Sequence, residues 1–417
     1  MVRRWHRRPR RERLWLDLGR GHSPMAGVVM YVGCSIHARF KLICLSKAEN
    51  SHVVILVTEF SRATRNVRCV ECSRPLPSTV GVEQITFCQV RMGMVQDHGV
   101  TITAPQLLRR ARSQLLTVFH PSQVKFGEPL SRHTYIKTGG PADIAVFPTD
   151  GDQVRAAVLA AKQLGLRYWV LGNGSNILVR DGGLRGLTII LTGLSKMRRI
   201  GQTVVAQGGA GVIQLAQFAR QHQLSGLEFA CGIPGTVGAG IRMNAGAYGG
   251  QMSDVLARVR VMDGAGEEHI LSAADLGLAY RDSAVETRGW IVLEALFPLT
   301  FEDGKAIQER MDHYTDRRRS KQPLDYPSCG SVFKRPRNGF ASQMIEESGL
   351  KGVRIGGAQV STKHAGFIVN LGGASTSDYL ALIHLVRTTV QKQHGVELEL
   401  EVKVIGDELS PATGGSG

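Results

Sequence analysis

Residues 232–250 read GIPGTVGAGIRMNAGAYGG, a run in which seven of nineteen residues are glycine. Glycine has no Cβ, so it permits left-handed backbone and a close approach of the chain to a ligand. So dense a run disfavours the interior of a helix or strand. The apolar residues Ile233, Val237 and Ile241 disfavour a polar, flexible linker. We therefore predict ordered backbone around a ligand, with a phosphate-bearing cofactor as first candidate, because successive N–H groups bind anions.

The excess of positive charge is concentrated at the start of the chain. The 417 residues have a formal net charge of +16, and residues 1–95 contribute 16 Lys and Arg against 6 Asp and Glu. The rest of the chain carries only about +6, which is ordinary for its size. Of the seven cysteines, only Cys231 and Cys329 lie beyond residue 95. Two cysteines provide no disulfide framework and suit a reducing cytoplasm, which is the predicted location.

Residues 1–95 differ in character from the rest of the chain. Their apolar patches show no sustained period, and the longest uncharged patch, residues 27–36, is too short to cross a membrane. The Cys-Val-Glu-Cys sequence at residues 69–72 lacks a second ligand pair, so no metal site is predicted. We interpret the segment as a basic extension of low structure and expect the working protein to begin near Met92 or Met94.

Periodicity predicts alternating helices and strands from about residue 120 onward. Helices are expected at residues 152–164, 212–219, 302–319, 341–348 and 375–394, and strands at 168–171, 177–179, 187–191, 204–206, 255–262, 268–271, 290–299, 365–371 and 397–405. Asp152 is expected to cap the first helix. In the last strand Glu399 and Glu401 share one face, because side chains alternate along a strand. The tail, residues 408–417, is expected to be disordered.

A second glycine-containing loop, Gly172-Asn173-Gly174-Ser175-Asn176, comes directly after the strand predicted at residues 168–171. By itself such a cluster indicates only a turn. The loop lies between two strands and lacks the G-x-G-x-x-G fingerprint that opens a helix in a Rossmann dinucleotide-binding unit. Together with residues 232–250, it predicts a nest for a pyrophosphate.

Seven stretches occur in an order that carries a resemblance to a known family. They are HTYIKTGGPAD (133–143), LGNGSNILV (171–179), GIPGTVGAGIRMNAGAYGG (232–250), YRDS (280–283), PSCGSVFKRP (327–336), KGVRIGGAQVSTKHAGFIVN (351–370) and LELEVKVIG (398–406). From about residue 120 to residue 407 the chain resembles the UDP-N-acetylenolpyruvoylglucosamine reductases, also called UDP-N-acetylmuramate dehydrogenases. No long tyrosine-bearing insertion separates Trp290 from Ser331, as in the shorter subtype of that family.

The resemblance implies an α+β fold with a vanillyl-alcohol-oxidase-like (PCMH-type) FAD-binding domain in two lobes, residues 133–300. A smaller C-terminal α/β substrate domain is expected at residues 322–407, after a helical lead-in (96–132) and a connecting helix (301–321). FAD is expected to be bound non-covalently. The residues that match the family's cofactor contacts are Gly139, Gly140, Gly172, Asn173, Gly174, Ser175, Asn176, Gly232, Ile233, Pro234, Gly235, Thr236, Val237, Gly238, Asn244, Ala245, Gly246 and Ala247.

The resemblance also implies a reaction. NADPH reduces FAD, and the flavin then reduces the enolpyruvyl double bond of UDP-N-acetylglucosamine enolpyruvate, giving UDP-N-acetylmuramate for peptidoglycan synthesis. The chemistry requires a proton donor and stabilisation of an enolate. Ser331 matches the family's proton donor, Arg281 its catalytic arginine and Glu401 its catalytic glutamate. Periodicity leaves Glu399 and Glu401 equally placed, and only the register of the motif selects Glu401.

Basic residues near the Gln-Pro step at 322–323 match the family's contacts to the UDP moiety. Arg318, Lys321 and Lys334 are the predicted substrate contacts, although a solvated run of charge is an equally good interpretation. The residues also leave two other functions open. One is a flavin oxidase of the same fold. The other is a nucleic-acid-binding protein that uses the basic residues 3–13, although no aromatic platform accompanies them. We predict neither nucleic-acid binding nor membrane insertion.

Overall fold

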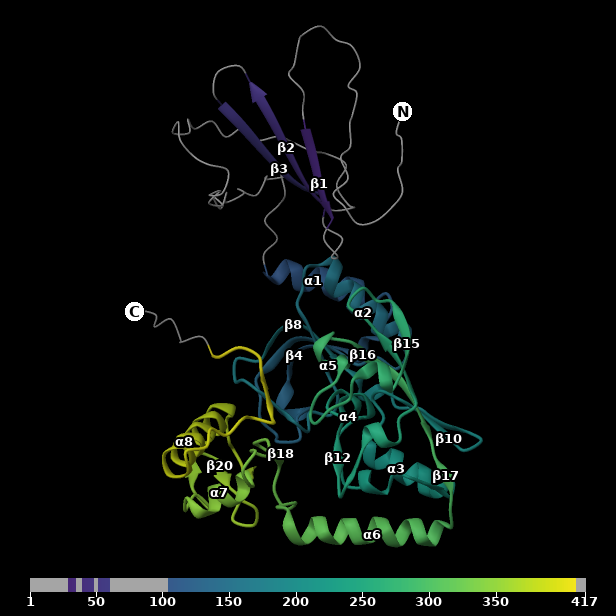
Figure 1. Ribbon diagram of the computed structural model, residues 1–417, viewed down its shortest axis with the longest axis vertical. Helices are drawn as coiled ribbons and strands as arrows, with labels where there is room; N and C mark the ends of the chain where they lie inside the picture. Colours follow the sequence, from purple (N-terminus) through teal and green to yellow (C-terminus); the bar gives the residue numbers. More distant parts are fainter. Residues whose placement is uncertain (1–28, 35–39, 49–51, 61–103, 410–417) are drawn as a thin grey trace. The chain divides into compact units, whose positions relative to one another are not determined.

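The computed structural model describes residues 29–34, 40–48, 52–60 and 104–409 (Figure 1). The chain divides into two compact units, Met1–Gly99 and Val100–Gly417. In the first unit, β1 (Val29–Cys34), β2 (Phe40–Ala48) and β3 (His52–Phe60) form an antiparallel sheet in that order. These strands were not expected in the basic extension. The other residues of that extension, and residues 410–417 of the tail, lie outside the described residues.

The second unit begins with α1 (Ala104–Leu115) and a four-stranded sheet. The sheet order is β4 (Val124–Pro129), β5 (Pro141–Val146), β8 (Leu184–Ile190) and β6 (Tyr168–Leu171), with only the β4–β5 pair antiparallel. Helix α2 (Gly151–Gln163) packs Val154 and Val158 into the core of this lobe. Its cap is Asp150, whose carboxylate accepts the N–H of Gln153 at 2.8 Å. The predicted cap, Asp152, is instead inside the first turn.

The second lobe is a five-stranded antiparallel sheet. Its order is β15 (Glu268–Ser272), β14 (Arg258–Met262), β16 (Ile291–Pro298), β10 (Thr203–Gln207) and β9 (Met197–Ile200). Buried side chains of α3 (Val212–Gln221) and α4 (Val237–Arg242) share one core with this sheet. The long helix α6 (Gly304–Lys321) adds Ile307 and Met311 to the same core. Short elements complete the lobe: β11 (Leu224–Ser225), β12 (Gly246–Ala247), β13 (Gly250–Gln251), α5 (Ala284–Thr287) and β17 (Thr300–Phe301).

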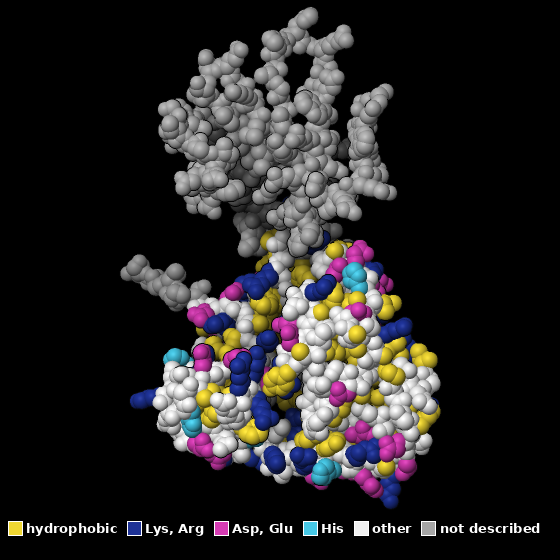
Figure 2. Space-filling view, in the orientation of Figure 1, with side chains coloured by type: hydrophobic (Ala, Val, Ile, Leu, Met, Phe, Trp, Pro, Cys, Tyr) yellow, Lys and Arg dark blue, Asp and Glu magenta, His cyan; other side chains and the backbone are white. Residues whose placement is uncertain are grey.

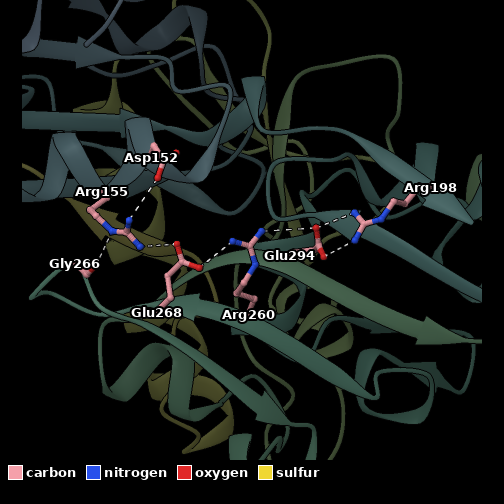
Figure 3. A network of polar contacts seen from close by, with 7 residues as sticks. All are labelled: Asp152, Arg155, Arg198, Arg260, Gly266, Glu268 and Glu294. Carbon is pink, nitrogen blue, oxygen red and sulfur yellow. Dashed lines mark hydrogen bonds and ion pairs between the residues drawn. The ribbon is translucent and has the colours of Figure 1, made fainter. Parts of the chain in front are cut away.

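An alternating chain of charges joins the two lobes (Figure 3). Arg155 of α2 lies 2.9 Å from Glu268 of β15, whose other oxygen accepts from Arg260 of β14 at 2.9 Å. The chain continues through Glu294 of β16 to Arg198 of β9, also at 2.9 Å. Because opposite charges alternate, each carboxylate bridges two cations, and the helix of the first lobe is tied to the sheet of the second.

The C-terminal part is a small α/β unit. Its sheet order is β18 (Ser328–Ser331), β21 (Phe367–Asn370), β20 (Ala358–Val360) and β19 (Arg354–Ile355), packed against α7 (Ala341–Glu347) and α8 (Thr376–His394). The chain then returns to the first lobe, where β22 (Lys403–Ile405) pairs in parallel with β7 (Ile177–Val179). Of the strand predicted at 397–405, only residues 403–405 form a strand, because residues 397–402 cross from the C-terminal part to the first lobe.

Part of the glycine-rich run is helical, contrary to prediction. Helix α4 contains Gly238 and Gly240. A Cβ at Gly238 would lie 3.1 Å from the carbonyl oxygen of Gly208, and one at Gly240 would lie 3.1 Å from Met252. Close packing against the second lobe outweighs the poor helix propensity of glycine here. Within the described residues, no helix is long and apolar enough to cross a membrane.

Candidate active site

A large cavity lies where the two lobes and the C-terminal part meet. Its volume is about 760 Å³, which is within the range of small-molecule and cofactor sites. Both glycine-containing loops line it, as do residues of β18 and of the 401–405 segment. Figure 2 shows Lys and Arg side chains gathered beside a hollow in the described part of the chain. The lining of the cavity is largely apolar and includes the cations Arg242, Arg281, Arg318 and Lys403.

The two glycine-containing loops pack directly against each other. Asn173 Nδ2 donates to the carbonyl of Pro234 at 2.6 Å. A Cβ at Gly172 would collide with the hydroxyl of Thr236, so only glycine allows this approach. Segments sixty residues apart therefore form one continuous wall, as the sequence predicted when it joined the two loops into a single site.

Most of the predicted cofactor residues lie in this wall. Those that line the cavity are Gly172, Asn173, Gly174, Ser175, Asn176, Gly232, Ile233, Pro234, Gly235, Thr236, Gly238, Ala245 and Gly246. Gly139, Gly140, Val237, Asn244 and Ala247 do not line it. Gly140 instead packs so closely on Asp181 that a Cβ would collide with its carbonyl.

The residues present fit FAD. The side-chain oxygen of Asn173 is buried and has no hydrogen-bond partner among the described residues. An acceptor without a partner in a cavity wall suits a ligand that brings N–H or O–H donors, and FAD has both. The close-packed glycine backbone around it leaves room for a long ligand beside the wall.

The predicted catalytic arginine and glutamate meet in the cavity. Arg281 Nε lies 2.6 Å from Glu401 Oε1, and both side chains are largely buried. Arg281 has φ = +58°, in the left-handed region that a non-glycine residue seldom occupies. Such strain occurs mainly at functional sites, where the surrounding structure holds it. The arrangement sets a cation and a carboxylate side by side in the cavity.

Ser331 lies at the end of β18 and lines the same cavity. The next residue, Val332, accepts the N–H of Glu401 at 2.9 Å. The strand that carries the serine is therefore bonded directly to the segment that carries the glutamate. Arg281, Ser331 and Glu401 come from three distant parts of the sequence, and the structure brings them to one cavity.

The structure separates the two glutamates that periodicity left equivalent. Glu399 is 73% exposed and pairs with Lys334 at 3.1 Å, whereas Glu401 is 11% exposed and faces the cavity. Residues 397–402 do not continue a flat strand, so strict alternation does not apply to them. The position of Glu401 agrees with the register of the motif.

Of the three predicted substrate residues, only Arg318 lines the cavity. Its guanidinium donates to the carbonyl of Gly232, and burial lowers its pKa. No carboxylate of the described residues lies within ion-pair distance of it, so a half-buried positive charge without an ionic partner lines the cavity. Lys334 is paired with Glu399 and, like Lys321, is not part of the cavity lining.

Three further charged residues of the wall were not predicted. Arg242 and Lys403 both pair with Glu286, and all three line the cavity. Arg242 lies inside the glycine-rich run, so the sequence already indicated that it lies near the site. Glu286 lies three residues beyond the YRDS motif and had no signal of its own.

Comparison with known proteins agrees with this geometry. Residues 142–272 match the family model "FAD binding domain", and residues 322–405 match "UDP-N-acetylenolpyruvoylglucosamine reductase, C-terminal domain". These matches confirm the predicted fold class.

Relatives named UDP-N-acetylenolpyruvoylglucosamine reductase from Levilactobacillus brevis and Listeria monocytogenes are each 49% identical over 296 residues. They cover 71% of this chain and 97% and 99% of their own length. The crystal structure of the reductase from Thermus caldophilus is 33% identical, covers 68% of this chain and 98% of its own, and has a TM-score of 0.59. The chain therefore belongs to the UDP-N-acetylenolpyruvoylglucosamine reductase family.

Proposed function

We propose that this protein reduces UDP-N-acetylglucosamine enolpyruvate to UDP-N-acetylmuramate with FAD as cofactor and NADPH as hydride donor. The observation that supports this most is the convergence of Arg281, Ser331 and Glu401 on a cavity walled by both glycine-containing loops. The cavity residues fit FAD, and the family is defined by a reductase of this name. Production of UDP-N-acetylmuramate places the reaction in peptidoglycan precursor synthesis.

FAD, when bound, supplies the chemistry that transfers a hydride from NADPH to the enolpyruvyl substrate. The protein's own side chains supply the rest. Arg281 places a permanent positive charge where the substrate carboxylate and its developing enolate need stabilisation. Ser331 lies on the cavity wall and gives a proton to the substrate carbon. Glu401, held by Arg281, supports that proton transfer.

The UDP moiety is a dianionic diphosphate attached to a nucleoside. Arg318 is the best placed of the predicted contacts, because its half-buried charge lines the cavity and has no carboxylate partner among the described residues. An anion that binds there gains a charge-assisted hydrogen bond without breaking an existing ion pair. Lys321 and Lys334 remain predicted contacts, and each would have to turn toward the ligand.

We also propose a cytoplasmic location and no nucleic-acid partner. The substrate and NADPH are both cytoplasmic metabolites in such a reaction. Cys231 and Cys329 are free thiols, in keeping with a reducing compartment.

The visible spectrum of the purified protein tests the function. We expect a flavin absorbance that NADPH bleaches and that the enolpyruvyl substrate restores in the absence of oxygen. Bleaching of the oxidised flavin by sugars or alcohols, with recovery of the absorbance in oxygen, would instead favour a flavin oxidase of the same fold. A colourless protein that takes up no FAD would refute both.

A further inference from the structure

Three charged residues form a second ion cluster in the cavity wall, beside the Arg281–Glu401 pair. Glu286 of α5 accepts a hydrogen bond from Arg242 Nε at the end of α4. Lys403 Nζ lies 3.5 Å from the other oxygen of Glu286. All of these residues line the same cavity. The ion cluster and the Arg281–Glu401 pair therefore belong to one wall.

Glu286 is connected to Arg281 by a short and well-bonded piece of chain. Arg281 lies at φ = +58° in a tight turn closed by two backbone hydrogen bonds. Ser283, two residues later, caps α5 and donates to the carbonyl of Arg242 at 2.7 Å. The bond between Arg242 and Glu286 fixes the same two helices a second time. A strained residue keeps its conformation only where its surroundings hold it, and these contacts provide that support.

Lys403 connects Glu286 to the segment that carries Glu401. Val402, between the two residues, is buried, and Glu401 and Lys403 both line the cavity. Asn176 fixes the backbone between them. Its Nδ2 donates to the carbonyl of Glu401 at 3.2 Å, and its own carbonyl accepts the N–H of Lys403 at 3.1 Å. The position of Lys403 is thus rigidly related to that of Glu401.

We propose that Glu286 is a positioning residue that holds Arg281 and Glu401 in register across the cavity. Its carboxylate pairs with Arg242, which is bonded to the segment that carries Arg281, and with Lys403, two residues after Glu401. It therefore joins two segments that are far apart in sequence. The inference rests on the proposed function, in which this pair acts on the enolpyruvyl group. Without the carboxylate, Lys403 loses its partner and the connection between the two segments is cut.

The charge state of the cluster agrees with this role. The hydrogen bond from Arg242 lowers the pKa of Glu286, and the nearby charge of Lys403 acts in the same direction. Glu286 is therefore ionised at neutral pH and can hold both cations.

Glu286→Gln tests the proposal through the two half-reactions. Displacing a positioned group by about 1 Å can cost about 100-fold, so we expect flavin reoxidation by the enolpyruvyl substrate to slow by about 10- to 100-fold. Reduction of the flavin by NADPH should change by less than about twofold, because it uses neither member of the pair. Equal slowing of both halves, or an unchanged reoxidation rate, would overturn the proposal.

Glu268→Gln is the matched control. Glu268 is 26% exposed and Glu286 is 27% exposed, and each bridges two cations, but Glu268 lies on β15 outside the cavity lining. We expect both half-reactions of this variant to match those of the unmodified protein. Loss of rate in the control would mean that any broken ion cluster has the same effect.

Lys403→Gln provides a second route, because it leaves the bond between Arg242 and Glu286 intact. We expect slower reoxidation in this variant, and no additional loss when it is combined with Glu286→Gln, because both changes cut the same connection. Independent, multiplying losses would contradict the proposal. If the flavin of the unmodified protein is not reoxidised by the enolpyruvyl substrate, the proposed function itself is refuted. Normal turnover in Glu286→Gln, in Lys403→Gln and in their combination would refute only the role of Glu286.

Discussion

Arg281 and Glu401 are 120 residues apart in the chain and form a 2.6 Å ion pair inside the cavity. The arginine stands on the turn before α5, and the glutamate lies two residues before β22. Each is placed by a different part of the fold, so the pair exists only when the C-terminal part is docked on the FAD-binding lobes. Changes to this pair, or to the residues around it, should therefore alter the chemistry more than the fold.

Ser331→Ala should slow flavin reoxidation by the enolpyruvyl substrate and leave flavin reduction by NADPH unchanged. Only the second half-reaction needs a proton on carbon, and loss of a positioned proton donor typically costs about 10²–10⁴-fold. Stopped-flow absorbance of the two half-reactions measures this. Equal slowing of both would assign Ser331 a structural role on β18.

Glu401→Gln should lower the reoxidation rate severely without unfolding the protein, because Gln is nearly isosteric with Glu. The expected loss is again about 10²–10⁴-fold. Glu399→Gln is the control, because Glu399 is exposed and faces away from the cavity. A surface change of this kind usually alters stability by less than about 0.5 kcal/mol. The measurement is the single-turnover rate of flavin reoxidation in both variants. A severe loss of that rate in Glu399→Gln, with Glu401→Gln near normal, would show that the motif register is wrong.

Arg318→Gln should weaken binding of the UDP-sugar substrate while the flavin stays bound. Charge-assisted hydrogen bonds contribute about 1.5–3 kcal/mol, which corresponds to about a 10- to 150-fold rise in Kd. Titration of the flavin spectrum with the substrate measures it. Arg319→Gln is the control, since Arg319 is exposed and outside the cavity lining. Equal affinity in both variants would remove Arg318 from the substrate site.

Deletion of residues 1–91 should leave FAD content and turnover intact. Every predicted site residue, and every residue that lines the cavity, lies in the unit Val100–Gly417. The measurements are the ratio of flavin to protein absorbance and the rate of NADPH consumption with the enolpyruvyl substrate. A truncated protein that cannot fold or hold FAD would show that the first unit is needed.

The charge chain between the lobes predicts a dependence of stability on pH. The hydrogen bond from Arg198 lowers the pKa of Glu294 below its unfolded value. The stabilisation is therefore complete above the unfolded pKa of about 4.3, and it is lost as the pH falls through the lower folded value. Glu294→Gln should lower the free energy of unfolding by about 0.5–1 kcal/mol at pH 7. Urea unfolding at pH 7 and pH 3 checks this, and an equal difference at both pH values would contradict it.

The sequence predicted those parts of the site that local patterns encode. Both glycine-containing loops were predicted to form one site, and they line one cavity, because glycine density and turn chemistry are visible in the residues themselves. The fold class and the confirmed family were predicted from seven ordered motifs. Strands with clear boundaries, such as β6 and β7, were placed to the residue.

Other features depend on contacts that no local pattern records. Helix α4 forms within the glycine run because Gly238 and Gly240 pack on distant residues. Glu399 and Glu401 are separated by the bend of the crossing chain rather than by alternation. Glu286 forms an ion cluster in the cavity wall because Arg242 and Lys403 reach it from other segments. Tertiary packing decided each of these cases.

The parallel pairing of β22 with β7 also has a consequence for biosynthesis. Strand β7, residues 177–179, cannot pair with β22 until residues 403–405 have been synthesised. A chain synthesised only as far as the end of the two lobes therefore lacks the Arg281–Glu401 pair. Closing so long a loop is slow relative to local folding. We infer that the newly made protein acquires its cofactor wall early and its chemistry last.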